Sequence, residues 1–109
     1  MAGLRIETRA SGGVTRVDLY GEFDLAGIRQ FETAIAPLEA GDPDVLVVDL
    51  TGVEFMDSSG LRALVMADQR ARDAGRRLAI VPGAPAIRRV FEITQLHDRL
   101  DLVENASSL

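Results

Sequence analysis

The sequence contains no cysteine, no lysine and no tryptophan among its 109 residues. Without cysteine the chain cannot form disulfides, thiolate metal sites or a cysteine nucleophile, and a cytosolic location is the natural expectation. No apolar run approaches the roughly 20 residues needed to span a bilayer. Residues 1–6 lack the apolar stretch of a signal peptide. We therefore expect a cytoplasmic protein that does not contact a membrane.

All 12 basic residues are arginines, against 17 acidic residues, and the net charge is −5. This balance argues against direct binding of nucleic acid, which depends on clustered positive charge. The absence of lysine also removes a P-loop, which requires Gly-Lys-Ser/Thr, and a receiver domain, whose pattern includes a lysine on its last strand. Asp49 could imitate a receiver's phosphoacceptor aspartate, but it is more simply a strand-end residue that bonds local backbone N–H groups.

Signals for catalysis or metal binding are weak. His97 is the single histidine, and we expect it near the loop before the last strand and not beside Ser58, as a nucleophilic pair would require. No G-x-S-x-G elbow is present. Carboxylates occur in pairs, such as Glu22 with Asp24 and Asp42 with Asp44, but none is grouped with a histidine as a metal site would be. We predict no enzymatic activity, no metal and no cofactor.

Hydrophobic residues make up 47% of the chain and charged residues 27%, which is typical of a folded globular domain. The length fits one domain, which we place over residues 1–109. Its core is expected over residues 4–103, with a flexible tail over 105–109.

Hydrophobic alternation and short β-branched runs predict strands, with a turn at 11–13 that makes the first two an antiparallel hairpin. The continuous apolar run 45–48 is typical of a central strand covered on both faces. The strands expected are 4–9, 16–20, 45–48, 78–81 and 100–103.

Apolar residues at helical spacing predict three helices between these strands. The first carries Ile28, Phe31, Ile35 and Leu38, with Asp24 as a plausible cap. The second runs from about 58 to 74 and follows a loop over 49–57, and the third covers about 87–94. This order predicts an α/β fold: a mostly parallel mixed sheet with an N-terminal hairpin and helices packed against it.

The segment Asp57-Ser58-Ser59-Gly60 lies where the expected loop over 49–57 turns into the second helix. Helix capping is the simpler interpretation of these residue types. It is compatible with a second one, because the unpaired N–H groups and the dipole of a helix N-terminus favour a phosphate. Arg62 follows Ser58 by four residues and could reach a phosphate there. Nearby carboxylates would repel a phosphate: Glu22, Asp24, Glu54 and Asp57.

Several segments together resemble the stand-alone bacterial anti-sigma factor antagonists of the STAS domain family. The central segment Phe55-Met56-Asp57-Ser58-Ser59-Gly60-Leu61 is similar to the signature of that family. Gly21-Glu22-Phe23-Asp24 is similar to its Gly-Glu-Leu-Asp motif, with phenylalanine in place of leucine. The segment 85–91 is similar to its last amphipathic helix. The resemblance runs from about Leu4 to Val103.

This resemblance implies a partner-switching regulator of transcription. The unphosphorylated protein would bind an anti-sigma factor that is also a serine kinase, and so free a sigma factor. Phosphorylation of Ser58 would release the kinase, and a serine phosphatase would reset the switch. The resemblance also implies a docking surface that includes Glu22, Phe23, Asp24, Met56, Asp57, Ser58, Ser59, Gly60 and Arg62.

Some alternatives remain open at the level of sequence. The chain could instead be a STAS-domain scaffold or a transporter-associated subunit that phosphorylation does not regulate. Nucleotide binding is weaker, because nothing resembles a triphosphate cradle. We expect a monomer or a weak dimer. Of the adjacent Phe55 and Met56, we expect one to anchor in the core and the other to lie near the partner surface.

Overall fold

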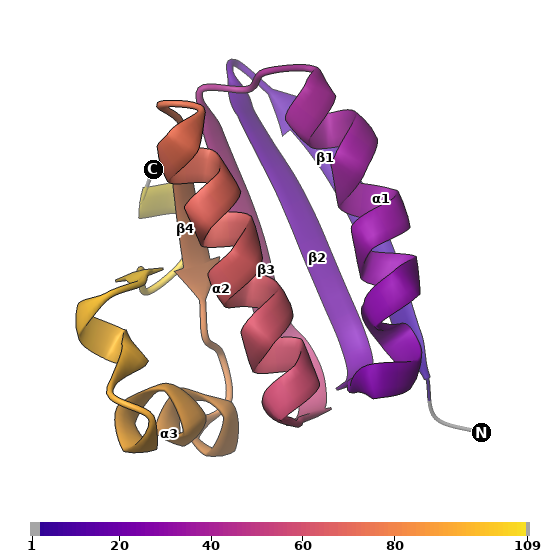
Figure 1. The fold of residues 1–109 in the computed structure, drawn as a ribbon, viewed down its shortest axis with the longest axis vertical. Coiled ribbons are helices and arrows are strands. Elements are labelled where there is room, and N and C mark those ends of the chain that lie inside the picture. Colours follow the sequence, from indigo (N-terminus) through magenta and orange to yellow (C-terminus); the bar gives the residue numbers. More distant parts are fainter. Residues whose placement is uncertain (1–2, 109) are drawn as a thin grey trace.

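A single five-stranded sheet, in the order β1-β2-β3-β4-β5, organises the chain (Figure 1). The computed structural model describes residues 3–108. The strands are β1 (Leu4–Ser11), β2 (Val14–Phe23), β3 (Val45–Met56), β4 (Arg77–Val81) and β5 (Asp101–Leu102). The helices are α1 (Ile28–Ala40), α2 (Ser58–Asp73) and α3 (Pro85–Ile93), with single 3-10 turns η1 (Leu25–Gly27), η2 (Leu96–Asp98) and η3 (Ala106–Ser108).

Strands β1 and β2 form the predicted antiparallel hairpin, in which Ser11 pairs with Val14. The turn between them consists of Gly12 and Gly13, whose φ angles of 58° and 86° require glycine or a similarly tolerant residue. Every later neighbour is parallel: β2 with β3, β3 with β4, and β4 with β5. The predicted α/β class and the mostly parallel mixed sheet are confirmed.

The core lies between the sheet and one layer of helices. Figure 1 shows α1 and α2 crossing the same face of the sheet. Phe31 and Ile35 of α1, Leu64 of α2 and Phe91 of α3 are fully buried in one cluster with the inward residues of the strands. Burying such side chains contributes about 1.5–3 kcal/mol each relative to exposure. The three helices were predicted from this apolar periodicity.

The central strand differs from the prediction in two ways. The helices of Figure 1 cover one face of it rather than both, and Val47, on the other face, is buried between its register partners Arg16 and Ala79. The strand also continues to Met56, so the predicted loop over 49–57 is wrong. Its second half pairs with the end of β2, as far as Phe23 with Met56. That partner supplies the hydrogen bonds that keep the chain extended.

The predicted helix cap also needs correction, whereas the flexibility of the tail stays a prediction. Asp24 precedes η1 and makes no side-chain capping bond, and α1 begins after Gly27. The segment expected to be a flexible tail includes η3, and Ser107 Oγ donates a 2.6 Å hydrogen bond to Asn105 Oδ1. Leu109 lies outside the described residues.

Candidate functional site

Asp57 alone separates the end of β3 from the start of α2. Its backbone is extended (φ −101°, ψ −174°), and its Oδ1 accepts hydrogen bonds from Ser59 N at 2.9 Å and Gly60 N at 3.1 Å. These bonds satisfy two of the N–H groups that a helix start leaves free. The capping interpretation is therefore confirmed for Asp57, and the two serine side chains are not needed for it.

The same carboxylate also reaches the segment that follows β2. Asp57 Oδ2 accepts a hydrogen bond of 3.4 Å from Leu25 N, the first residue of η1. Gly60 is buried where α2 passes over the end of β2, next to the carbonyl group of Phe23. The two segments singled out in the sequence, 21–24 and 57–60, are thus brought together by parallel strand pairing and by these contacts.

Ser58 is the exposed residue of this corner, whereas Ser59 is half-buried. Within residues 3–108 the Ser58 hydroxyl makes no hydrogen bond. His97 lies on η2, where its Nδ1 is 3.4 Å from Phe91 O and its Nε2 is 3.6 Å from Asp98 Oδ1. The histidine therefore does not activate Ser58, and the pair lacks the arrangement of a nucleophilic catalyst. The corner therefore presents an exposed hydroxyl at the first position of a capped helix.

Burial divides the residues that the resemblance assigned to the docking surface. Phe23 is fully buried, with its ring 5.0 Å from that of Phe31, and Met56 is 6% exposed. This burial removes both side chains from the surface on which we had placed them. Glu22 and Asp24 are half-buried at the edge, and Arg62 is exposed one turn along α2.

Phe55 takes the surface position that the sequence interpretation gave to Met56. Its side chain is 50% exposed, while its neighbour lies in the core. One of the two was expected inside and one outside, and the structure shows that division. The assignment of Met56 to the docking surface missed the strand alternation, which places neighbours on opposite faces.

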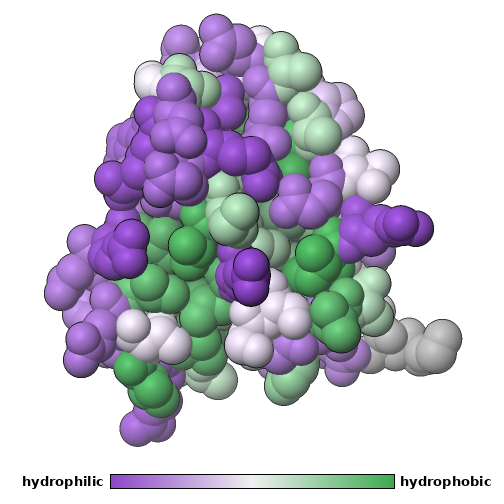
Figure 2. Space-filling view, in the orientation of Figure 1, coloured by the Kyte–Doolittle hydropathy of each residue, from purple (hydrophilic) through white to green (hydrophobic). Residues whose placement is uncertain are grey.

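Apolar residues gather on the same half of the molecule as Ser58. Figure 2 shows hydrophobic surface over the lower half of the helical face, where Figure 1 places α3 and the start of α2, while the upper half is mostly polar. The most exposed large apolar side chains are Leu25 at 73%, Ile93 at 72%, Phe55 and Met66. Exposed apolar groups around a polar centre are typical of a protein-docking surface.

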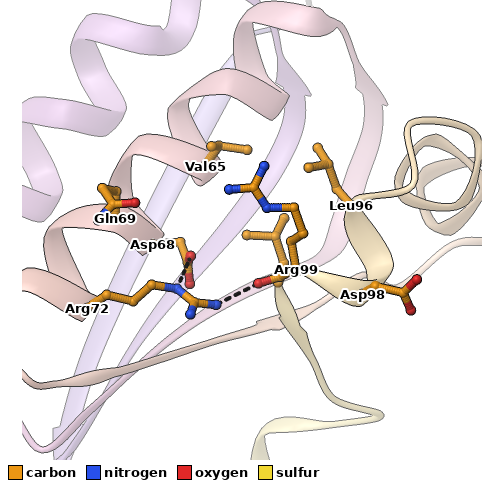
Figure 3. A pocket seen from close by; sticks show the side chains of 8 residues that line it. Val65, Asp68, Gln69, Arg72, Leu96, Asp98 and Arg99 are labelled. Atoms are coloured by element: carbon orange, nitrogen blue, oxygen red, sulfur yellow. Dashed lines mark hydrogen bonds and ion pairs between the residues drawn. The ribbon is translucent and has the colours of Figure 1, made fainter.

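A hollow of about 280 Å³ lies between α2 and η2 (Figure 3). Arg72 crosses it, donating from Nε to Asp68 Oδ2 at 2.7 Å and from Nη2 to Arg99 O at 2.6 Å. The hydrogen bond to Asp68 raises the pKa of the Arg72 guanidinium above its ordinary value. These bonds attach the 96–100 segment to α2. The hollow is therefore the place where these two segments pack against each other.

A second hollow, of about 260 Å³, lies on the sheet face away from the helices and was not predicted. Arg16 Nη2 lies 3.2 Å from both Asp18 Oδ1 and Asp49 Oδ2. Asp49 Oδ1 also accepts a 2.9 Å bond from Thr51 N, as expected for a residue that bonds local backbone. Arg9 Nη2 lies 3.4 Å from Asp18 Oδ2, so two carboxylates and two guanidinium groups balance in charge. This is a structural use of charge.

The described part of the chain holds no cluster of three or more histidine, cysteine or acidic side chains that could bind a metal. No helix in it is long and apolar enough to cross a bilayer.

Comparisons with known proteins agree with this geometry. Residues 6–104 match the family model described as "Mlab, STAS domain". An anti-sigma-B factor antagonist of Staphylococcus aureus is 30% identical over 101 residues, which cover 93% of this chain and 94% of that protein. The crystal structure of an anti-sigma factor antagonist from Mycobacterium paratuberculosis has a TM-score of 0.89 and 28% identity, covering 97% of this chain and 90% of the other. The phosphorylated form of the Bacillus protein SpoIIAA shares the fold, with a TM-score of 0.71 and 19% identity, covering 97% of this chain and 96% of the other.

Proposed function

Since the chain belongs to the STAS domain family, we propose that it is an anti-sigma factor antagonist that works by partner switching. In its unmodified form it binds an anti-sigma factor with serine kinase activity, and a sigma factor is freed. Phosphorylation of Ser58 releases the kinase, and a serine phosphatase restores the binding form. The similarity to the Staphylococcus aureus antagonist over nearly the whole chain supports this proposal.

The observation that carries the proposal is the state of Ser58. The residue is exposed at the first position of α2, and its hydroxyl makes no hydrogen bond with the described residues 3–108. Asp57 caps the helix instead, so modification of Ser58 removes no bond that the fold needs. A kinase can therefore reach the hydroxyl without unfolding the corner.

The surroundings of Ser58 explain how a phosphate could end binding. Exposed apolar residues supply contact area: Leu25, whose N–H donates to Asp57, and Phe55, three residues before Ser58. Glu22, Asp24 and Asp57 lie at the same edge. A phosphoserine adds a charge of about −2 to this surface. Burying that charge beside carboxylates against a partner is unfavourable through repulsion and desolvation.

Binding measurements with Ser58 variants test the proposal. Ser58→Ala should fold normally and hold the anti-sigma factor kinase constitutively. Ser58→Asp should weaken binding by about 2 kcal/mol or more, roughly 30-fold, if the charge becomes buried in the complex. Titration calorimetry measures both affinities, with Ser59→Ala as the matched control that keeps the phosphorylation site.

Mass mapping after incubation with ATP and the kinase completes the test. One phosphate on Ser58, absent in Ser58→Ala, is the expected result. Equal kinase affinity of the wild-type protein and Ser58→Asp, with no modification of Ser58, would contradict the switch. That outcome would favour a STAS scaffold or a transporter-associated subunit that phosphorylation does not regulate.

A further inference from the structure

Helix α2 carries three arginines, and two of them are held by carboxylates. Arg70 Nε lies 2.9 Å from Glu39 Oε2, and its Nη2 lies 3.2 Å from Glu32 Oε2. Arg72 is bound to Asp68. The guanidinium of Arg62, by contrast, is exposed and makes neither an ion pair nor a hydrogen bond with any residue in the 3–108 range.

Arg62 lies on the same face of α2 as Ser58. Residues four apart on a helix are neighbours, with about 5–6 Å between their Cβ atoms, and an acidic group N-terminal to a basic one is the better order. A phosphate on Ser58 would stand in that order relative to Arg62. A guanidinium can bind two phosphate oxygens at once, which makes such pairs strong.

Two of the usual alternative partners for that phosphate are already occupied. A phosphate at a helix start ordinarily accepts bonds from the first free N–H groups. Here Asp57 Oδ1 accepts from Ser59 N and Gly60 N, and a second anion could use these donors only by displacing that carboxylate. Among the three arginines of α2, Arg62 is the one that no carboxylate holds within residues 3–108.

We propose that Arg62 captures the phosphate of Ser58 within the same molecule. This inference rests on the proposed function, because it assumes that Ser58 is the modified residue. After modification the docking surface presents neither the free hydroxyl nor the free guanidinium of its unmodified form. The switch therefore withdraws a positive charge from the partner at the same time as it adds a negative one.

A phosphoserine installed at position 58 during translation tests the capture without any kinase. Phosphorus NMR then follows the second ionisation of the phosphate, whose ordinary pKa is about 6, in the wild-type protein and in Arg62→Gln. The pair with Arg62 should lower this pKa, because it favours the dianion. Nearby carboxylates act on the phosphate in both proteins and cancel in the difference: Glu22, Asp24, Glu54 and Asp57.

We expect the phosphate pKa to be lower by about half a unit in the phosphorylated wild-type protein than in phosphorylated Arg62→Gln. The phosphorylated wild-type protein should also have a melting temperature about 2 °C or more above that of phosphorylated Arg62→Gln. Without the phosphate, the wild-type and Arg62→Gln proteins should have the same melting temperature. Arg89→Gln on α3, an exposed arginine that is also without a partner in the described chain, is the matched charge control and should leave the phosphate titration unchanged.

An equal phosphate pKa in phosphorylated wild type and phosphorylated Arg62→Gln would overturn the capture. This result does not depend on any kinase, because the phosphoserine is installed during translation. Equal shifts in Arg62→Gln and Arg89→Gln would also overturn it, because they would show an effect of net charge alone. Failure of any kinase to modify Ser58 would count against the proposed function instead. The two failures are therefore distinguishable.

Discussion

Gly60 of α2 lies directly against the carbonyl oxygen of Phe23 in β2. A Cβ at residue 60 would be 2.3 Å from that oxygen and 3.0 Å from Met56 Cγ, closer than side-chain atoms tolerate. The glycine therefore allows the start of α2 to rest on the end of β2. Without that approach, the segments 21–24 and 57–60 could not share one surface.

Gly60→Ala should lower the free energy of unfolding by about 2 kcal/mol, because the backbone of β2 or α2 must move. Urea denaturation measures the change. Gly41→Ala is the control, since its φ is −75° and the nearest atom to its Cβ would be Leu38 O at an ordinary 3.5 Å. If the free energy of unfolding falls equally in both variants, the close approach of Gly60 to Phe23 does not contribute to stability.

Asp57→Ala should lower the free energy of unfolding by about 1 kcal/mol, through loss of the helix cap. It should also free η1, because Asp57 Oδ2 accepts the bond from Leu25 N. Hydrogen exchange should therefore speed up at Leu25 as well as at Ser59 and Gly60. Asp57→Asn keeps an acceptor oxygen and should recover most of the loss; no recovery would mean that the charge, and not the bond, stabilises the corner.

Phe55→Ala and Met56→Ala should separate binding from stability. Met56 is 6% exposed, so its truncation leaves a cavity and should cost about 2–4 kcal/mol of stability. Phe55 is 50% exposed, so its truncation should cost less than about 1 kcal/mol while weakening the partner complex. Melting and titration calorimetry on each variant distinguish the two effects. Unchanged affinity of Phe55→Ala would remove it from the docking surface.

Arg16→Leu should destabilise the sheet face away from the helices. The substitution leaves the Asp49 side chain, which is 14% exposed, without its cation, and leaves Asp18, which is 9% exposed, with only the exposed Arg9 at 3.4 Å. We expect a loss of about 2–3 kcal/mol in urea denaturation, because a poorly paired charge with little access to water is unfavourable. Arg88→Leu, whose pair with Glu104 is exposed and 3.9 Å long, should change stability by less than about 1 kcal/mol. Similar effects of both variants would show that burial of the cluster is unimportant.

Much of the fold follows from local patterns in the sequence. The apolar periodicity of Phe31 and Ile35 predicted α1, and the paired glycines after Ser11 predicted the hairpin turn. The length of β3 was not predictable in this way, because Thr51-Gly52 looks like a turn. In the structure Gly52 lies in the strand, where a Cβ would be 2.3 Å from Tyr20 Cδ1. That contact depends on the neighbouring strand, which local patterns do not reveal.

The surroundings of the candidate site were predicted only in part. The segment 57–60 was expected where a loop over 49–57 leads into a helix, and the structure has the helix start but a strand in place of the loop. The burial of Phe23 could have been found by continuing the alternation of Val17 and Leu19 along β2. The polar cluster around Arg16 could not, because it joins side chains from two strands whose register only the folded sheet defines.

A single connecting residue, Asp57, joins β3 to the helix that carries Ser58, the proposed phosphorylation site. With no loop between strand and helix, we expect phosphorylation of Ser58 to act without a slow rearrangement of the backbone. The duration of the response would then depend only on the lifetime of the phosphoserine. The rates of the kinase and the phosphatase would set how fast the response begins and ends, so the same domain could serve fast or slow regulatory circuits without a change in its structure.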